Sequence, residues 1–127
     1  MILAVHPVLM ARDVPTSIAF FLRLGFTLVF TDSSASPRYA VLTRDACELH
    51  LQWQDESQWQ GHPDRPTYRF LVADVDRFFH ELLSSGIVSD PSASGSPWAL
   101  PGNTPWGTRE FHLKDPGGNG LQFYRPV

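Results

Sequence analysis

The sequence has little of what marks secreted, membrane-embedded or nucleic-acid-binding proteins. Its single cysteine, Cys47, cannot form an internal disulfide, which is typical of a protein kept in a reducing cytoplasm. No apolar run approaches the ~20 residues that span a bilayer, and the apolar residues 1–5 lack the basic flank of a signal peptide. Lys and Arg form no cluster, and the net charge of −3 disfavours a nucleic-acid partner. We therefore expect a cytoplasmic protein that binds neither membranes nor nucleic acids.

What the sequence does contain is a repeat. Asp13 opens a helical pattern that stops at Gly25, and Asp74 opens a second pattern that stops at Gly86. The start and the stop are displaced by the same 61 residues (74 − 13 and 86 − 25). Asp before the first helical residue and Gly after the last are boundary signals, so the shared displacement indicates a duplicated supersecondary unit. The predicted helices cover residues 14–23 and 75–85.

Strand patterns complete each copy, and 127 residues are enough for one domain with a core of its own. We predict an α+β fold in which two tandem βαβββ modules form one curved, cup-shaped mixed sheet with helices on its convex face. A long loop rich in Ser, Pro and Gly is predicted at residues 89–107. The predicted boundaries are module one at residues 1–54, a linker at 55–66 and module two at 67–127, and the first strand is expected at 4–11.

The strand alternation separates a core face from a polar face. The core positions are Leu49, Leu51, Phe111, Leu113, Leu121 and Phe123. The positions expected to line the cup are Glu48, His50, Gln52, Glu110, His112, Gln122 and Tyr124. Polar side chains on a sheltered, concave surface are unusual unless something polar binds there. Solvated strand faces remain an alternative for these residues, and for His6 a half-solvated strand edge is as open as a pocket role.

Two stretches carry a resemblance to a known family. One runs from Trp106 to Tyr124 through the turn Asp115-Pro116-Gly117-Gly118-Asn119-Gly120, and the other is Val8 to Val14 followed by Phe20-Phe21 and Leu24-Gly25-Phe26. They resemble the vicinal oxygen chelate superfamily, which contains glyoxalase I, extradiol dioxygenases, fosfomycin-resistance enzymes and bleomycin-resistance proteins. The likeness covers nearly the whole chain and is closest to the bleomycin-resistance-like branch. This fold hosts lyases, oxygenases, transferases and pure binders, so it does not fix the chemistry.

The resemblance implies first a metal-independent binding protein without a cofactor, which confers antibiotic resistance by sequestration. Relatives of this kind are homodimers whose pockets form between subunits, often with exchanged N-terminal strands. Trp98, Trp106 and Tyr124 would stack on an aromatic ligand, while Glu48 and Glu110 would favour a cation; for the two Trp a dimer contact is also open. The candidate ligand-binding residues are His6, Glu48, His50, Trp98, Trp106, Glu110, His112, Gln122 and Tyr124.

The resemblance implies as an alternative a metal-dependent lyase, isomerase or dioxygenase. Carried over by position, the ligands of a divalent metal ion fall on His6, Glu48 and Gln122. The remaining ligand falls on Thr67 or Tyr68, neither of which is a usual ligand for such an ion. The candidate bases of that enzyme are His50, Glu110 and His112. A third, weaker alternative is an accessory domain that binds a protein partner.

Overall fold

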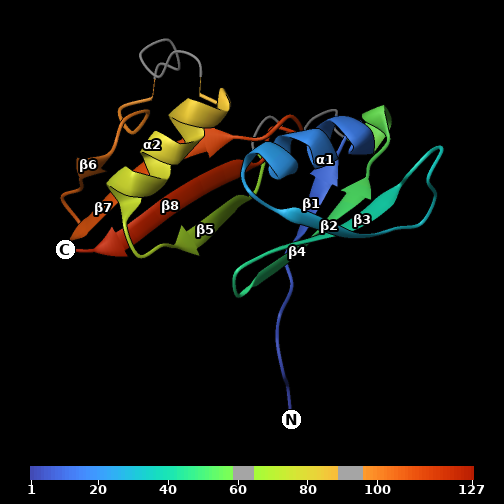
Figure 1. Cartoon of the computed structure of the whole chain (residues 1–127), viewed down its shortest axis with the longest axis horizontal. Helices are drawn as coiled ribbons and strands as arrows, with labels where there is room; N and C mark the ends of the chain where they lie inside the picture. Colours follow the sequence, from blue (N-terminus) through green and yellow to red (C-terminus); the bar gives the residue numbers. More distant parts are fainter. Residues whose placement is uncertain (59–64, 89–95) are drawn as a thin grey trace.

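The chain folds as two βαβββ modules, which confirms the fold class predicted from the sequence (Figure 1). The structure, a computed structural model, describes residues 1–58, 65–88 and 96–127. Module one consists of β1 (Val8–Ala11), α1 (Val14–Arg23), β2 (Thr27–Thr31), β3 (Tyr39–Arg44) and β4 (Cys47–Trp53). Module two consists of β5 (Thr67–Leu71), α2 (Val75–Ser85), β6 (Gly102–Asn103), β7 (Thr108–Lys114) and β8 (Gly120–Pro126). A short 3-10 helix, η1 (Glu56–Gln58), begins the connection between the modules, and the rest of that connection lies partly outside the described residues.

The repeated Asp and Gly residues lie at the start and the end of both helices, as predicted. Gly25 and Gly86 follow the last turns of α1 and α2 with φ of 90° and 77°, in the left-handed region that favours glycine. Asp74 caps α2, because its carboxylate accepts a hydrogen bond from the backbone N–H of Arg77 at 3.1 Å. Asp13 occupies the same position before α1, but its carboxylate accepts from the Thr16 hydroxyl instead. The two copies therefore share their helix boundaries and differ in how the first turn is capped.

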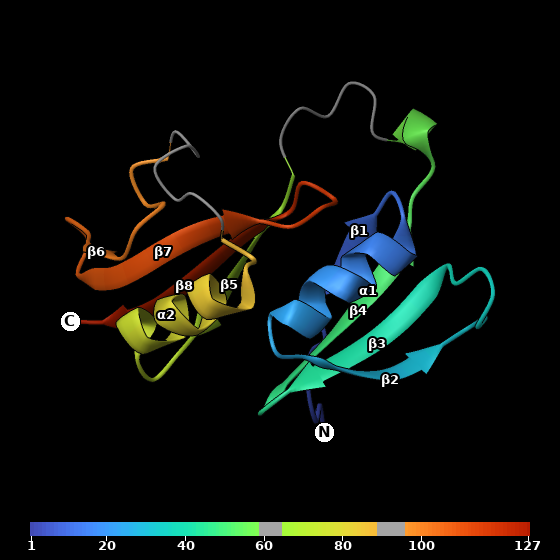
Figure 2. The same cartoon turned by 45° about the horizontal axis from the view of Figure 1, so that its top comes forward.

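Both helices cover the same side of the strands (Figure 2), and the core lies between helices and strands. Sheet order is β1-β4-β3-β2 in module one and β5-β8-β7-β6 in module two, with β1 parallel to β4 and β5 parallel to β8. The predicted core positions are confirmed: Leu113 packs partly buried against the core and the other five are buried, namely Leu49, Leu51, Phe111, Leu121 and Phe123. The polar faces of β4, β7 and β8 consequently point to the side without helices.

The two modules meet along the free edge of β1. The backbone carbonyl of Val8 accepts a hydrogen bond from the Tyr68 hydroxyl at 3.0 Å, and that of Met10 accepts from Asn119 Nδ2 at 2.9 Å. A Cβ on Gly117 would lie 2.4 Å from the Met10 oxygen, so the backbone approach requires glycine there. Within the described residues, side chains and not a strand ladder join the modules. The strands therefore form two four-stranded sheets where the sequence analysis expected one continuous sheet.

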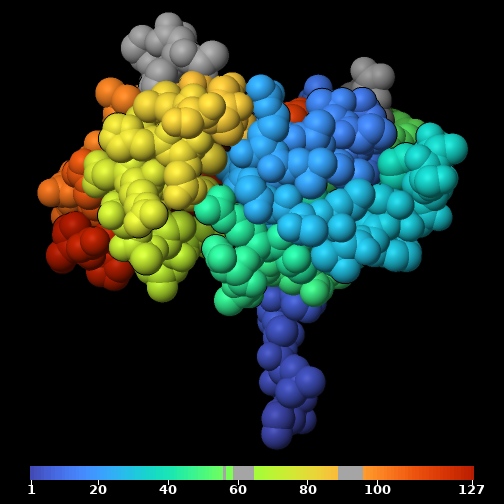
Figure 3. Space-filling view, viewed as in Figure 1, coloured from blue at the N-terminus to red at the C-terminus, as the bar shows by residue number. Residues whose placement is uncertain are grey.

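The first strand is shorter than predicted, since β1 begins at Val8 and residues 1–7 precede it. This N-terminal arm projects from the body of the molecule (Figures 1 and 3). Its side chains at Met1, Ile2, Leu3 and Val5 are at least 86% exposed although all are apolar. In the predicted loop 89–107, residues 96–107 are described and contain the short strand β6, while residues 89–95 lie outside the described part.

Candidate functional site

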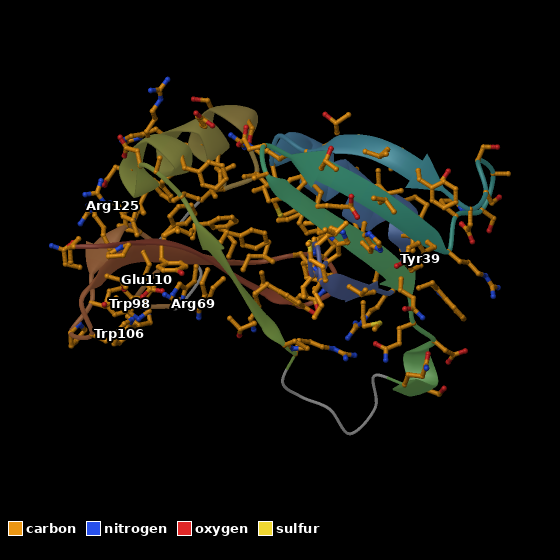
Figure 4. All side chains as sticks on the ribbon, turned by 90° about the horizontal axis from the view of Figure 1, so that it is seen from below. Tyr39, Arg69, Trp98, Trp106, Glu110 and Arg125 are labelled. Atoms are coloured by element: carbon orange, nitrogen blue, oxygen red, sulfur yellow. The ribbon has the colours of Figure 1, made fainter. Side chains whose placement is uncertain are left out.

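The predicted site residues form two clusters on the side of the strands that faces away from the helices. The module-one cluster consists of His6, Tyr39, Glu48 and His50. The module-two cluster consists of Arg69, Trp98, Trp106, Glu110, His112, Gln122 and Tyr124. Seen from below, Tyr39 lies at one end of the molecule, while Arg69, Trp98, Trp106 and Glu110 gather at the other (Figure 4). One chain therefore presents two half-sites and not one closed cup.

The module-one cluster is a chain of hydrogen-bonded side chains. Glu48 Oε2 lies 2.8 Å from His50 Nε2 and 3.2 Å from His6 Nε2, and the two imidazole rings stack with centroids 5.5 Å apart. The other ring nitrogen of His50, Nδ1, lies 2.6 Å from the Tyr39 hydroxyl. The hydrogen bond from His50, and the charges of the nearby imidazoles, lower the pKa of Glu48 despite its partial desolvation. Glu48 is therefore a carboxylate at neutral pH, as the sequence analysis assumed.

Glu110 is the buried centre of the module-two cluster, with a side chain 0% exposed. Its Oε1 accepts from the Trp106 indole N–H at 2.8 Å and the Thr108 hydroxyl at 2.7 Å. Its Oε2 lies 2.8 Å from His112 Nε2 and 3.1 Å from Arg69 NH1. Burial alone raises the pKa of Glu110, but the hydrogen bonds from Thr108, His112 and Trp106, and the charge of Arg69, lower it to about 2.

This burial changes the role expected of Glu110. The sequence analysis placed its carboxylate on the cup surface, where it would attract a cationic ligand. In the structure the carboxylate is covered, and its charge is already matched by the Arg69 guanidinium. The alternation of β7 does put Glu110 on the side away from the helices, but residues 98–106 fold back over that face, since the backbone N–H of His112 donates to the carbonyl of Trp98 at 2.8 Å. Glu110 thus holds the cluster together from beneath.

The two tryptophans pack together next to the buried carboxylate of Glu110. Trp98 and Trp106 meet edge to face with ring centroids 5.5 Å apart, and Trp98 also lies 6.2 Å from the His112 ring. Trp106 is 58% exposed although its indole N–H is tied to Glu110, so the ring is both fixed and open to solvent. Arg69 lies 4.0 Å over the Tyr124 ring and donates to Gln122 Oε1 at 2.6 Å. The result is an aromatic surface with a buried polar foundation.

The alternative metal set does not come together in this arrangement. The amide oxygen of Gln122 accepts a hydrogen bond from the Arg69 guanidinium. A metal ion at that oxygen would have to displace the guanidinium and would be repelled by its positive charge. His6 and Glu48 belong to the module-one cluster, where His6 Nε2 lies 3.2 Å from Glu48 Oε2, and not to the cluster of Gln122. Tyr68 is engaged with the backbone of Val8. Among the described residues, no group of three or more His, Cys, Asp and Glu side chains is arranged to hold a metal ion. Within one chain, these residues are therefore not arranged as a metal centre.

Two members of the clusters were missed from the sequence. Tyr39 shares a face of β3 with Val41, which pairs with His50, and Arg69 lies opposite Gln122 on β8. Alternation along β3 and β5 could have placed both side chains, but their pairing partners depend on the strand register.

A groove with a volume of about 590 Å³ lies elsewhere. It runs between the modules, where Phe70, Leu71 and Phe78 line it beside the β3–β4 turn. Of the predicted site residues, none lines this groove, although Arg69 does. The surfaces that carry the predicted residues are thus open in a single chain.

No helix in the described residues is long and apolar enough to cross a membrane.

Solved structures of known proteins share this fold. The structure is similar to the bleomycin resistance determinant encoded on transposon Tn5, with a TM-score of 0.76 and 23% identity over 98% of both chains. It is similar to a bleomycin-binding protein in complex with bleomycin (TM-score 0.74, 26% identity, 99% of this chain and 100% of that one). It is also similar to the Streptomyces verticillus bleomycin-binding protein in complex with copper(II)-bleomycin (TM-score 0.72, 28% identity, 97% and 95%).

A search of curated protein sequences finds no match. The sequence model of the Glyoxalase/Bleomycin resistance protein/Dioxygenase superfamily, in contrast, matches residues 4–123, almost the whole chain. This is the superfamily that the closing and opening motifs indicated. The chain belongs to the Glyoxalase/Bleomycin resistance protein/Dioxygenase superfamily.

Proposed function

We propose that this protein sequesters an aromatic, cationic small molecule without changing it chemically. The observation that carries the proposal is the fixed, solvent-exposed ring of Trp106 beside Trp98. Aromatic side chains that are held rigid by a buried partner and left open to solvent are characteristic of recognition surfaces. Two of the similar solved proteins are complexes with bleomycin and with copper(II)-bleomycin, which supports a small-molecule-binding function here.

We assign the binding of the ligand's positively charged group to the module-one cluster. Glu48 is a carboxylate that is 35% exposed, whereas Glu110 is covered and paired with Arg69. A ligand cation can therefore approach Glu48 but cannot reach Glu110. His6 and His50 flank Glu48 and complete the polar half of the site.

The ligand pocket is proposed to form between two copies of the chain. The two half-sites lie at opposite ends of one chain, so a ligand that contacts both needs the module-one cluster of one copy beside the module-two cluster of another (Figure 4). The projecting apolar arm supports a dimer, because Ile2, Leu3 and Val5 are otherwise left in water. Analytical ultracentrifugation of the full chain and of a variant lacking residues 1–5 tests this: we expect a dimer that dissociates on truncation. A monomeric full chain would contradict the proposal.

Binding is proposed to need no metal, because Arg69 occupies the amide oxygen of Gln122. Elemental analysis of protein purified without chelator provides the test. A stoichiometric transition metal would overturn the metal-free proposal and favour a metal-dependent enzyme instead.

Calorimetric titration with bleomycin tests the binding function itself. Trp106→Ala is expected to weaken binding at least about tenfold, because an anchoring aromatic side chain is lost. The matched control is Leu83→Ala, which removes another exposed apolar side chain from α2, on the far side of the strands. Equal affinity of the wild type and Trp106→Ala would refute the role of the aromatic surface, and absence of binding by the wild type would exclude bleomycin as the ligand.

A further inference from the structure

Tyr39 is held in place by hydrogen bonds to Asp32, at the start of the turn that precedes β3. The Asp32 carboxylate accepts hydrogen bonds from the backbone N–H groups of Arg38 and Tyr39 at 2.9 and 3.1 Å. The backbone N–H of Asp32 in turn donates to the Tyr39 carbonyl at 3.2 Å. The two hydrogen bonds from Arg38 and Tyr39 lower the pKa of Asp32, so the clasp is present at neutral pH. The first residue of β3 is therefore fixed before any ligand arrives.

The hydrogen bonds of the module-one cluster have one consistent direction. Glu48 is a carboxylate and can only accept, so His50 Nε2 carries the proton and donates to it. When its imidazole is neutral, His50 has only this one N–H, and its Nδ1 is then an acceptor. The Tyr39 hydroxyl, 2.6 Å away, must then donate its proton to Nδ1. Its oxygen has no proton left to offer and presents only lone pairs to the concave side.

We propose that Tyr39 is a ligand-contacting residue whose hydroxyl, kept as a pure acceptor by His50 and Glu48, binds a protonated amine or amidinium of the ligand. This assignment deepens the proposed binding function and rests on the same concave surface. The ligand cation meets the Tyr39 oxygen directly, and the negative charge of Glu48 reaches it through the polarised His50 ring. A ligand hydroxyl gains less there, because it brings no charge to the carboxylate.

The direction of the hydrogen bonds can be tested without any ligand. A long-range ¹H–¹⁵N spectrum of the full chain at about pH 8, above the ordinary titration range of histidine, reports the tautomer of each imidazole. We expect His50 to carry its proton on Nε2. A proton on Nδ1 would turn the Tyr39 hydroxyl into a donor toward the ligand side and would overturn the proposal.

The ligand preference is tested with two probes that share a ring, tryptamine with its ammonium and tryptophol with a hydroxyl. Their dissociation constants are measured by NMR titration of the wild type and of Tyr39→Phe, which keeps the ring and removes the oxygen. We expect the wild type to prefer tryptamine, and the preference to fall about tenfold in Tyr39→Phe, the usual effect of one hydrogen bond to a charged group. Ser84→Ala is the control, because it removes a hydroxyl from an exposed position of α2, on the far side of the strands.

An unchanged preference in Tyr39→Phe, equal binding of the two probes, or no binding of either would overturn the assignment of Tyr39. The outcome is separable from that of the bleomycin titration. Bleomycin that binds Tyr39→Phe as tightly as the wild type leaves sequestration in place and removes Tyr39 from it. Conversely, a Tyr39-dependent preference for tryptamine in a protein that does not bind bleomycin retains the Tyr39 site and removes bleomycin as its ligand.

Discussion

Replacing Glu110 by Gln tests the buried foundation of the aromatic surface. The carboxylate accepts from four groups, two at each oxygen. The amide of Gln keeps one acceptor oxygen and turns the other position into a donor. In either orientation two of the four donors lose their acceptor, and Arg69 loses its charge partner.

The expected loss follows from the pKa of Glu110. A carboxylate whose pKa is about 2 in the folded protein and 4.5 as an ordinary Glu is stabilised by about 3 kcal/mol when ionised. Removing one partner from a buried ion pair costs a similar ~3–5 kcal/mol. Glu110→Gln should therefore lower the free energy of unfolding by about 3 kcal/mol at neutral pH.

Urea unfolding followed by tryptophan fluorescence provides the assay, repeated from about pH 7 to about pH 3. Because the folded pKa of Glu110 is depressed, its stabilisation is complete above the reference value of 4.5 and is lost as the pH falls toward about 2. Protonated Glu110 is as uncharged as Gln. The difference between the wild type and Glu110→Gln should therefore stay constant down to a pH of about 4.5 and shrink below it.

The control is Glu81→Gln, which removes a carboxylate from a half-exposed pair with Arg44 at 3.1 Å. Such pairs contribute about 0–1 kcal/mol. The reasoning is refuted if Glu110→Gln costs no more than Glu81→Gln. It is equally refuted if the wild type and Glu110→Gln keep a constant difference between pH 7 and pH 3.

Two further predictions concern the helix starts and the seam between the modules, both measured by urea unfolding at neutral pH. Asp74→Ala should lower the free energy of unfolding by about 1 kcal/mol, because it removes the side chain that caps a backbone N–H. Asp13→Ala loses only a hydrogen bond from the Thr16 hydroxyl and should lower it by less. Equal losses would contradict the difference in capping. Gly117→Ala should lower the free energy of unfolding by about 1–3 kcal/mol, because the new Cβ would clash with the backbone oxygen of Met10. An unchanged free energy of unfolding would show that the backbone at the contact between the modules can shift to make room.

Local signals in the sequence were enough to predict both modules apart from β6, which lies within the predicted loop 89–107. The Asp and Gly residues at the helix ends and the alternation along β4, β7 and β8 depend on neighbours a few residues away, so the helix bounds and the core face follow from them. The same alternation placed Glu48, His50 and His112 on the concave side.

What the sequence could not supply depends on contacts between distant residues. Glu110 was expected at the surface because alternation reports which side a residue faces and not what covers it. The fold-back of Trp98 and Trp106, 12 and 4 residues earlier in the chain, made it a buried centre. Tyr39 and Arg69 were missed for a related reason, since each joins its cluster through a register that no local pattern specifies.

The seam along β1 has a consequence for how such a protein can diversify. Val8 and Met10 hold the second module through their carbonyl oxygens, which every amino acid possesses. Their side chains alternate with the buried Leu9 and Ala11 and so face away from α1. Mutations at positions 8 and 10 can therefore reshape the surface on this side of β1 while the two hydrogen bonds to the second module are kept. New specificities could thus arise at this strand with little loss of folding stability.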